Sequence, residues 1–141
     1  MKKLFFAILA IVAAISASSL AVDAEGASST KVIAYYFYGS FRCYTCTNME
    51  KYSREAVEAN FKDALTSGKL EFRAVNVEER GNEHFVNDYQ LYTKSLILSL
   101  VKDGKEVRHK NLDKIWQLVR NKQKFITYVT DEVNAFLEET K

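Results

Sequence analysis

Proline is absent from this chain and cysteine occurs only twice, which limits the classes of protein to which it can belong. Two cysteines are too few for the disulfide framework of a small secreted protein. Basic residues (20 Lys plus Arg) barely exceed acidic ones (18 Asp plus Glu), so we do not expect a nucleic-acid partner. The sequence also has no glycine-rich phosphate loop, and we therefore expect neither a flavin nor another cofactor.

The N-terminal segment predicts export from the cytosol. Two lysines precede an apolar run over residues 4–17, and small residues then offer cleavage after Ala21 or Ala24. The alternative is an uncleaved membrane anchor, because residues 4–22 form a stretch of 19 and about 20 apolar residues span a bilayer. We interpret residues 1–24 as a signal peptide and expect an exported protein, periplasmic or secreted.

After a flexible lead-in over residues 25–31, residues 32–141 predict one α/β domain. Runs of β-branched and aromatic residues predict strands over residues 32–38, 70–77 and 95–101, and an Asp-Gly turn predicts a hairpin with a return strand over 106–110. Apolar periodicity predicts one helix of about six turns after the cysteines. Further helices are expected around residues 81–92 with Asn82 as N-cap, 111–119, and 121–139 with Asn121 as N-cap.

This order, β-α-β-α-β-β-α, predicts a four-stranded mixed sheet with helices on both faces. Two βα units favour parallel pairing of the first three strands, and the closing hairpin adds an antiparallel edge. Chemistry in sheets of this kind gathers beyond the carboxyl ends of the strands. The cysteine pair follows the first strand directly, and we expect it at that edge.

Cys43 and Cys46 are expected at the start of a helix and one turn further on. Unpaired N–H groups and the partial positive charge of a helix N-terminus favour a thiolate, and Arg42 adds a cation beside Cys43. We predict Cys43 as the nucleophile and Cys46 as the resolving thiol, exchanging a disulfide with a protein partner, which could be membrane-bound. A purely structural bridge is disfavoured, because closing so short a loop adds little stability.

Metal binding is the main alternative chemistry. Cys43, Cys46, His84 and His109 could together form a Cys2His2 zinc site, although their spacing fits no finger pattern and both histidines are expected on the surface. The dithiol alone could instead capture a soft ion such as arsenite or Cu(I). In that case the protein would be a binding module without fast redox turnover.

The element order, with "FRCYTC" after the first strand, and the segment "KSLILSLVKDGK" resemble the thioredoxin fold over residues 32–141. More narrowly, "VIAYYFYGSFRCYTC", "SGKLEFRAVNV", "NEHFVNDYQLYTKS" and "KNLDKIW" are similar to an exported bacterial family named nitrophenyl-compound nitroreductase subunit ArsF. The thioredoxin-like resemblance implies a thiol–disulfide oxidoreductase. The family name implies an association with arsenic or nitroreductase genes.

The chain departs from the pattern that this resemblance implies. Leu96 stands where a cis-proline is usual, and a non-proline cis bond costs about 3 kcal/mol, so we expect a trans bond or a strained cis bond held by packing. Phe37 stands where a buried acid usually accepts the proton of the resolving thiol. The dipeptide Tyr44-Thr45 between the cysteines matches none of the well-known redox motifs. It therefore does not indicate whether the reduction potential of the pair is high or low.

Other residues are expected to support the pair because residues 92–95 should face Cys43. The supporting residues are Arg42, Tyr44, Thr45, Lys94, Ser95 and Leu96. Arg42 and Lys94 are expected in a basic collar, whereas Lys51 and Arg54 are interpreted as ordinary solvated side chains. Trp116, which lies between apolar neighbours, is expected in the core.

Overall fold

The computed structural model describes residues 29–141, and the expected signal peptide lies outside these residues. The elements in chain order are β1 (Thr30–Tyr38), α1 (Tyr44–Asn60), α2 (Lys62–Thr66), β2 (Leu70–Asn76), α3 (His84–Asp88), β3 (Ser95–Lys102), β4 (Lys105–Asn111), α4 (Ile115–Leu118) and α5 (Lys122–Glu138). The boundary of the lead-in at residue 31 was placed too late. Thr30 and Lys31 already belong to β1, where they pair with Lys102 and Val101 of β3.

The four strands form one mixed sheet in the order β2-β1-β3-β4, which confirms the expected class. β1 is parallel to β2 but antiparallel to β3, so the prediction of two parallel pairs is wrong for the second. The connection from β2 to β3 contains only the five-residue helix α3. Ser95 at the start of β3 pairs with Phe37 near the end of β1. The chain therefore does not cross to the opposite edge of the sheet before β3 begins.

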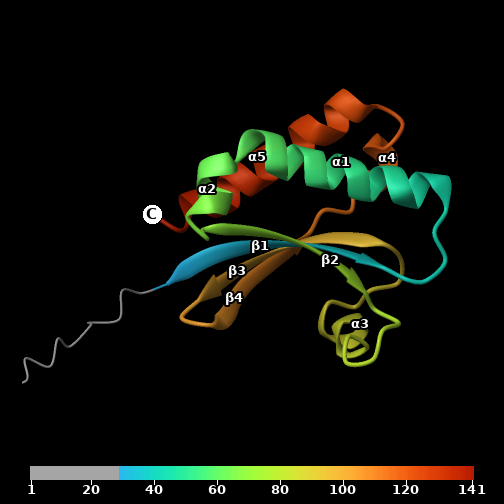
Figure 1. The fold of residues 1–141 in the computed structure, drawn as a ribbon, viewed down its shortest axis with the longest axis horizontal. Coiled ribbons are helices and arrows are strands. Elements are labelled where there is room, and N and C mark those ends of the chain that lie inside the picture. Colours follow the sequence, from blue (N-terminus) through green and yellow to red (C-terminus); the bar gives the residue numbers. More distant parts are fainter. Residues whose placement is uncertain (1–28) are drawn as a thin grey trace, which may run out of the picture.

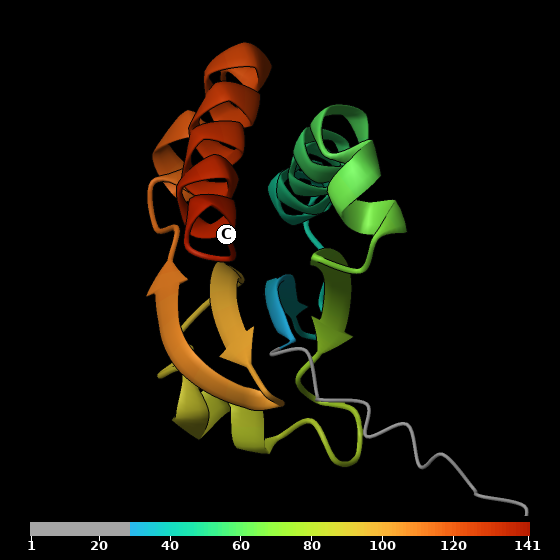
Figure 2. The ribbon, with the colours of Figure 1, turned by 90° about the vertical axis from the view of Figure 1, so that its left-hand side faces the viewer.

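Helices cover both faces of the sheet unequally (Figures 1 and 2). The helices α1, α2, α4 and α5 lie on one face, whereas α3 lies on the other. The larger core cluster fills the space under α1 and α5, with Met49 and Val57 from α1 and Phe125, Val129 and Phe136 from α5 fully buried. Among residues 29–141, no helix combines the length and the apolar character needed to cross a bilayer.

The helix after the cysteines is divided in two, so the prediction of one continuous helix is wrong. Phe61 leaves helical geometry (φ −129°, ψ 38°) and is 8% exposed, so its side chain joins the core at the break. Just before it, the Asn60 side-chain amide donates to the Ala56 carbonyl (2.8 Å). Bonds of this kind compete with the backbone ladder of a helix.

The two predicted helix caps differ in outcome. Asn121 caps α5 as expected, because its side-chain oxygen accepts a hydrogen bond from the Lys124 backbone N–H (3.0 Å). Asn82 does not cap α3. Its amide donates instead to the Asn76 carbonyl (3.0 Å) and ties the loop to the end of β2, while Glu83 precedes the helix.

Candidate redox site

The disulfide between Cys43 and Cys46 lies at the N-terminus of α1, beyond the carboxyl end of β1. Cys43 is the N-cap residue, with extended backbone, and its Sγ accepts a hydrogen bond from the Cys46 N–H at 3.1 Å. Cys43 is half-buried, whereas Cys46 is only 2% exposed. The structure thus confirms the predicted positions, with a half-buried Cys43 at the helix start and a buried Cys46 a turn later.

Tyr36 of β1 supports the pair from the core. Its hydroxyl donates a hydrogen bond to the Cys46 carbonyl (2.7 Å), and its side chain is fully buried. Burial raises the pKa of Tyr36 far above its ordinary value, and the negative charge of Glu50 adds to this, while Arg42 opposes it. The hydroxyl therefore remains protonated and acts as a constant donor under the second cysteine.

Of the two residues expected in the basic collar, Arg42 is paired with a carboxylate of α1. Arg42 forms an ion pair with Glu50, and its guanidinium lies 4.1 Å from the centre of the Tyr38 ring. Arg54 also approaches Glu50 (3.6 Å) and pairs with Glu58 (3.3 Å). The sequence pattern did not single out Glu50, although it lies four residues after Cys46 and on that same side of α1.

The loop before β3 meets the segment that leads to Cys43, as expected. The Lys94 ammonium lies 5.8 Å from the centre of the Phe41 ring, and the Ser95 hydroxyl donates to the Thr93 carbonyl (2.9 Å). Trp116 also reaches this loop. Its indole N–H donates to the Lys94 carbonyl (3.0 Å), and it is 38% exposed, so its assignment to the core is wrong.

A helix turn in α4 explains the error at Trp116. Its neighbour Ile115 is fully buried and occupies the core position of this turn, which leaves the indole at the surface. An indole N–H is a donor that needs a partner when it is partly desolvated. The carbonyl before β3 provides that partner.

The two departures from the thioredoxin-like pattern are both buried. Every peptide bond among the described residues is trans, including the one before Leu96, so the trans alternative is the one observed. Leu96 is fully buried and pairs with Tyr36 across the sheet. Phe37 is 1% exposed and packs against Phe85 and Tyr89 on the α3 face (ring centroids 5.0 and 5.4 Å apart). The Phe37 ring therefore belongs to the cluster on the α3 face, on the opposite side of the sheet from α1.

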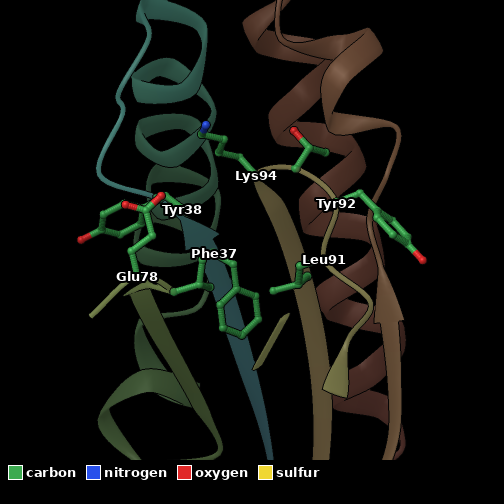
Figure 3. Close-up of a pocket in the computed structure, with 9 residues that line it drawn as sticks. Phe37, Tyr38, Glu78, Leu91, Tyr92 and Lys94 are labelled. Atoms are coloured by element: carbon green, nitrogen blue, oxygen red, sulfur yellow. The ribbon is translucent and has the colours of Figure 1, made fainter. Parts of the chain in front are cut away.

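A hollow of about 160 Å³ opens beside the site (Figure 3). Its lining residues are Phe37, Tyr38, Gly39, Val77, Glu78, Leu91, Tyr92, Thr93 and Lys94. Phe37 and Leu91 face each other across it, whereas Tyr92 points away. Glu78 accepts a hydrogen bond from the Ser40 N–H (3.0 Å), and bonding to Ser40 holds the pKa of Glu78 below its ordinary value.

The backbone at Gly39 lies close to the Glu78 carboxylate. A Cβ at position 39 would require that flexible side chain to move away from its present position. The hollow is thus built by the end of β1, the end of β2 and the loop before β3.

Large aromatic side chains are exposed on the segment that carries the disulfide and on the loop before β3. Phe41 is 75% exposed, Tyr44 is 84% exposed and Tyr92 is 92% exposed. Phe41 precedes the cysteines, Tyr44 lies between them, and Tyr92 belongs to the facing loop. We name Phe41, Tyr44, Tyr92 and Trp116 the aromatic rim. Exposed apolar side chains gathered in one place are typical of a surface that binds another protein.

The four residues of the alternative zinc site are not brought together. His84 lies on α3 and pairs with Asp88 (2.7 Å), whereas His109 lies on β4 and pairs with Glu106 (2.8 Å). Within residues 29–141, no three side chains of His, Cys, Asp or Glu are grouped as metal ligands would be.

Known proteins resemble this chain only in part. No protein-family model matches the chain, and no similar sequence was found among curated proteins. Solved structures that match in part include three thioredoxins. That of Fasciola hepatica is 24% identical (67% of this chain, 81% of that one, TM-score 0.39), that of Thermus thermophilus 14% (64%, 72%, 0.39), and thioredoxin f2 of Chlamydomonas reinhardtii 15% (67%, 82%, 0.36).

The class of the domain follows from its own architecture. It is an α/β domain with a four-stranded mixed sheet, helices on both faces, and a Cys-X-X-Cys disulfide at the start of the helix after β1. This is the thioredoxin-like arrangement expected from the sequence.

Proposed function

We propose that this chain is an exported thiol–disulfide oxidoreductase that exchanges the Cys43–Cys46 disulfide with a partner protein. The observation that carries the proposal is the asymmetry of the pair at the N-terminus of α1. Cys43 is accessible to a second molecule, whereas Cys46 is shielded by the protein. This asymmetry supports a role for Cys43 in intermolecular exchange and for Cys46 in resolution.

The exchange proceeds through a mixed disulfide. When the chain is reduced, the Cys43 thiolate attacks a disulfide of the partner, forms a bond to one sulfur and releases the other as a thiolate. The Cys46 thiolate then attacks Cys43, closes the internal disulfide and releases the second partner thiolate. Two electrons pass to the partner, and the reverse sequence of steps oxidises a partner dithiol.

The helix N-terminus supplies the charge stabilisation that this exchange needs. Its first N–H groups point toward the site, and the Cys46 N–H already donates to Cys43 Sγ. Since Phe37 replaces the usual acid, proton removal from Cys46 falls to solvent or to the partner. We expect slower turnover than in an enzyme with a buried acceptor.

A protein is the partner that the surface favours, because the exposed aromatic side chains of Phe41 and Tyr44 flank Cys43 in the chain. Export is supported by the signal-peptide pattern of residues 1–24, and disulfides persist in compartments such as the periplasm. The similarity to the ArsF family is compatible with this location. A membrane-bound redox partner is included in the proposal.

Reduction of insulin by dithiothreitol tests the proposed activity. The mature chain is expected to accelerate the reaction, and Cys43→Ser is expected to abolish the acceleration, because the serine hydroxyl cannot open a disulfide. Cys46→Ser should instead accumulate a mixed disulfide that is visible on a non-reducing gel. Wild-type protein that is no faster than Cys43→Ser would contradict the proposal.

Capture of a soft ion by the reduced pair is the second candidate. It is favoured by the buried Phe37, since binding needs two close thiolates but no proton relay, and the two Cα atoms are 5.0 Å apart. Equilibrium dialysis of the reduced protein with arsenite or Cu(I) separates the two candidates. Affinity no greater than that of a free dithiol would remove this one.

A further inference from the structure

The carboxylate of Glu50 sits in the charge environment of the redox pair. Glu50 lies one turn after Cys46 and two turns after Cys43 along α1, and its side chain is 18% exposed. It forms an ion pair with Arg42, the residue that immediately precedes Cys43. The cation that the sequence places beside the nucleophile is therefore already engaged by an anion from the same helix.

The ion pair is held from several sides. The Tyr38 ring lies under the Arg42 guanidinium (4.1 Å), and Arg54 approaches Glu50 from the next turn (3.6 Å). These contacts restrict the motion of both partners. They keep the guanidinium of Arg42 directed toward Glu50 instead of leaving it free to turn over the disulfide.

The charge of Glu50 also reaches the buried side of the pair. After burial itself, Glu50 is the main cause that raises the pKa of Tyr36, and the Tyr36 hydroxyl donates to the Cys46 carbonyl at 2.7 Å. A carboxylate that acts on this hydroxyl is also within electrostatic reach of the adjacent sulfur atoms, since partly buried charges are weakly screened.

We propose that Glu50 is a positioning residue that sets the redox balance of the Cys43–Cys46 pair by holding Arg42 and offsetting its charge. This inference rests on the proposed thiol–disulfide exchange. With Glu50 in place, the Cys43 thiolate gains less from Arg42, and the dithiol form is less stable relative to the disulfide. Loss of the carboxylate frees the cation and favours the thiolate.

The other charged groups near the pair are the same in every variant, so their effect on the Cys43 thiol does not change between variants. Lys94 lies at the Phe41 ring on the facing loop, and Glu78 lies at the end of β2 beside Ser40. On β1, the Tyr36 hydroxyl donates to the Cys46 carbonyl and the Tyr38 ring lies at the Arg42 guanidinium. None of these groups is paired with Glu50, so a change at position 50 leaves them in place.

The test is a set of variants, Glu50→Gln, Arg42→Gln and the double variant, measured in the reduced protein. The rate at which iodoacetamide alkylates Cys43, followed by mass spectrometry against pH, gives the pKa of its thiol. Equilibration with glutathione gives the ratio of dithiol to disulfide. Glu58→Gln is the matched control, because Glu58 also pairs with Arg54 but lies two turns further along α1.

Glu50→Gln is expected to lower the pKa of the Cys43 thiol by about 0.5 to 1 unit, since one unscreened neighbouring charge shifts a pKa by about 1–3 units and exposure reduces this. The glutathione equilibrium should move about 3- to 10-fold toward the dithiol. Arg42→Gln should shift both quantities in the opposite direction. The double variant should lie closer to wild type than either single variant, because the two charges are removed together.

Two outcomes would overturn the inference: a Cys43 pKa in Glu50→Gln equal to that of wild type, or equal shifts in Glu50→Gln and Glu58→Gln. Glu50→Asp, which keeps the charge, should restore most of the wild-type pKa, whereas a merely structural role would not follow charge in this way. The alkylation needs no partner protein. A shifted pKa together with inactivity toward insulin would therefore refute the proposed function while leaving this inference intact.

Discussion

Tyr36 shows how one core residue links the sheet to the site. Its position on β1 pairs with Ala74 of β2 and Leu96 of β3, so the ring lies in the middle of the sheet. The ring fills the larger core cluster, and only the hydroxyl meets a polar partner, the Cys46 carbonyl. A buried hydroxyl without a partner would be costly, so this bond fixes the height of the first turn of α1 above the sheet.

Tyr36→Phe is expected to reduce the free energy of unfolding by about 1 kcal/mol, the usual contribution of one hydrogen bond, with the ring still in place. Urea denaturation of the oxidised protein measures this loss. Tyr38→Phe is the matched control, because the Tyr38 hydroxyl makes no hydrogen bond among residues 29–141 and should change stability by less than about 0.5 kcal/mol. Equal effects of the two substitutions would show that the hydroxyl of Tyr36 does not support the site.

Sequence reasoning succeeded at single residues where a local rule was sufficient. Cys43 at the helix start, the buried Phe37 and the trans bond before Leu96 all follow from chain order and elementary conformational costs. It missed Glu50 and Trp116, because their roles depend on partners that only the folded chain brings near. A glutamate on a helix is unremarkable in sequence until the position of Arg42 is known.

At the scale of elements, α5 is the helix whose ends and inner face follow best from sequence. Phe125, Val129, Val133 and Phe136 recur at three- and four-residue steps and are all fully buried. Asn121 adopts extended backbone (φ −129°, ψ 93°) and caps the first turn. The signal at Asn82 is similar, but a nearby carbonyl at the end of β2 takes its amide instead.

Asn121→Ala is expected to lower the free energy of unfolding by about 1 kcal/mol, because the Lys124 N–H loses its acceptor. Thermal and urea unfolding both report the change. Asn134→Ala makes the same substitution on the exposed surface of α5, where alanine is the better helix former, and should be neutral or slightly stabilising. A loss at position 134 as large as that at position 121 would mean that the cap contributes nothing specific.

The direction of β3 was less accessible to sequence reasoning than its position. Ser95 to Leu100 form a buried run that marks a central strand in either direction. Apolar patterning does not decide between parallel and antiparallel pairing, and the extent of α3 was uncertain from its weak pattern. The break at Phe61 was hidden for a related reason, since its buried side chain continues the apolar spacing of α1.

At the scale of the whole molecule, the two faces of the sheet are stabilised differently. Long helices cover one face, whereas α3 and its loops cover the other with a smaller cluster around Tyr35, Phe37 and Ile97 (Figure 2). A polar network supplements this thinner layer. Glu106 of β4 accepts hydrogen bonds from the Tyr89 hydroxyl beside α3 and from the buried Ser99 hydroxyl of β3.

The network makes the α3 face sensitive to acid. Burial by itself would raise the pKa of Glu106, but hydrogen bonds from Ser99, Tyr89 and His109 outweigh it and hold the pKa below the ordinary value of 4.5. A carboxyl group with a depressed pKa in the folded state stabilises the protein fully above its unfolded pKa. That contribution is lost as the pH falls through the folded value. The sensitive window therefore begins near pH 4.5 and extends below it.

Glu106→Gln is expected to destabilise the protein at about pH 7, with a difference from wild type that shrinks steadily below about pH 4.5. The urea midpoint of each protein, measured between about pH 7 and about pH 3, gives this difference directly. Glu138→Gln is the matched control, since among residues 29–141 Glu138 pairs only with Lys141 at the exposed C-terminal end and should give a small difference at every pH. A Glu106→Gln difference that stays constant across the window would show that the ionised carboxylate is not what holds α3 against β3 and β4.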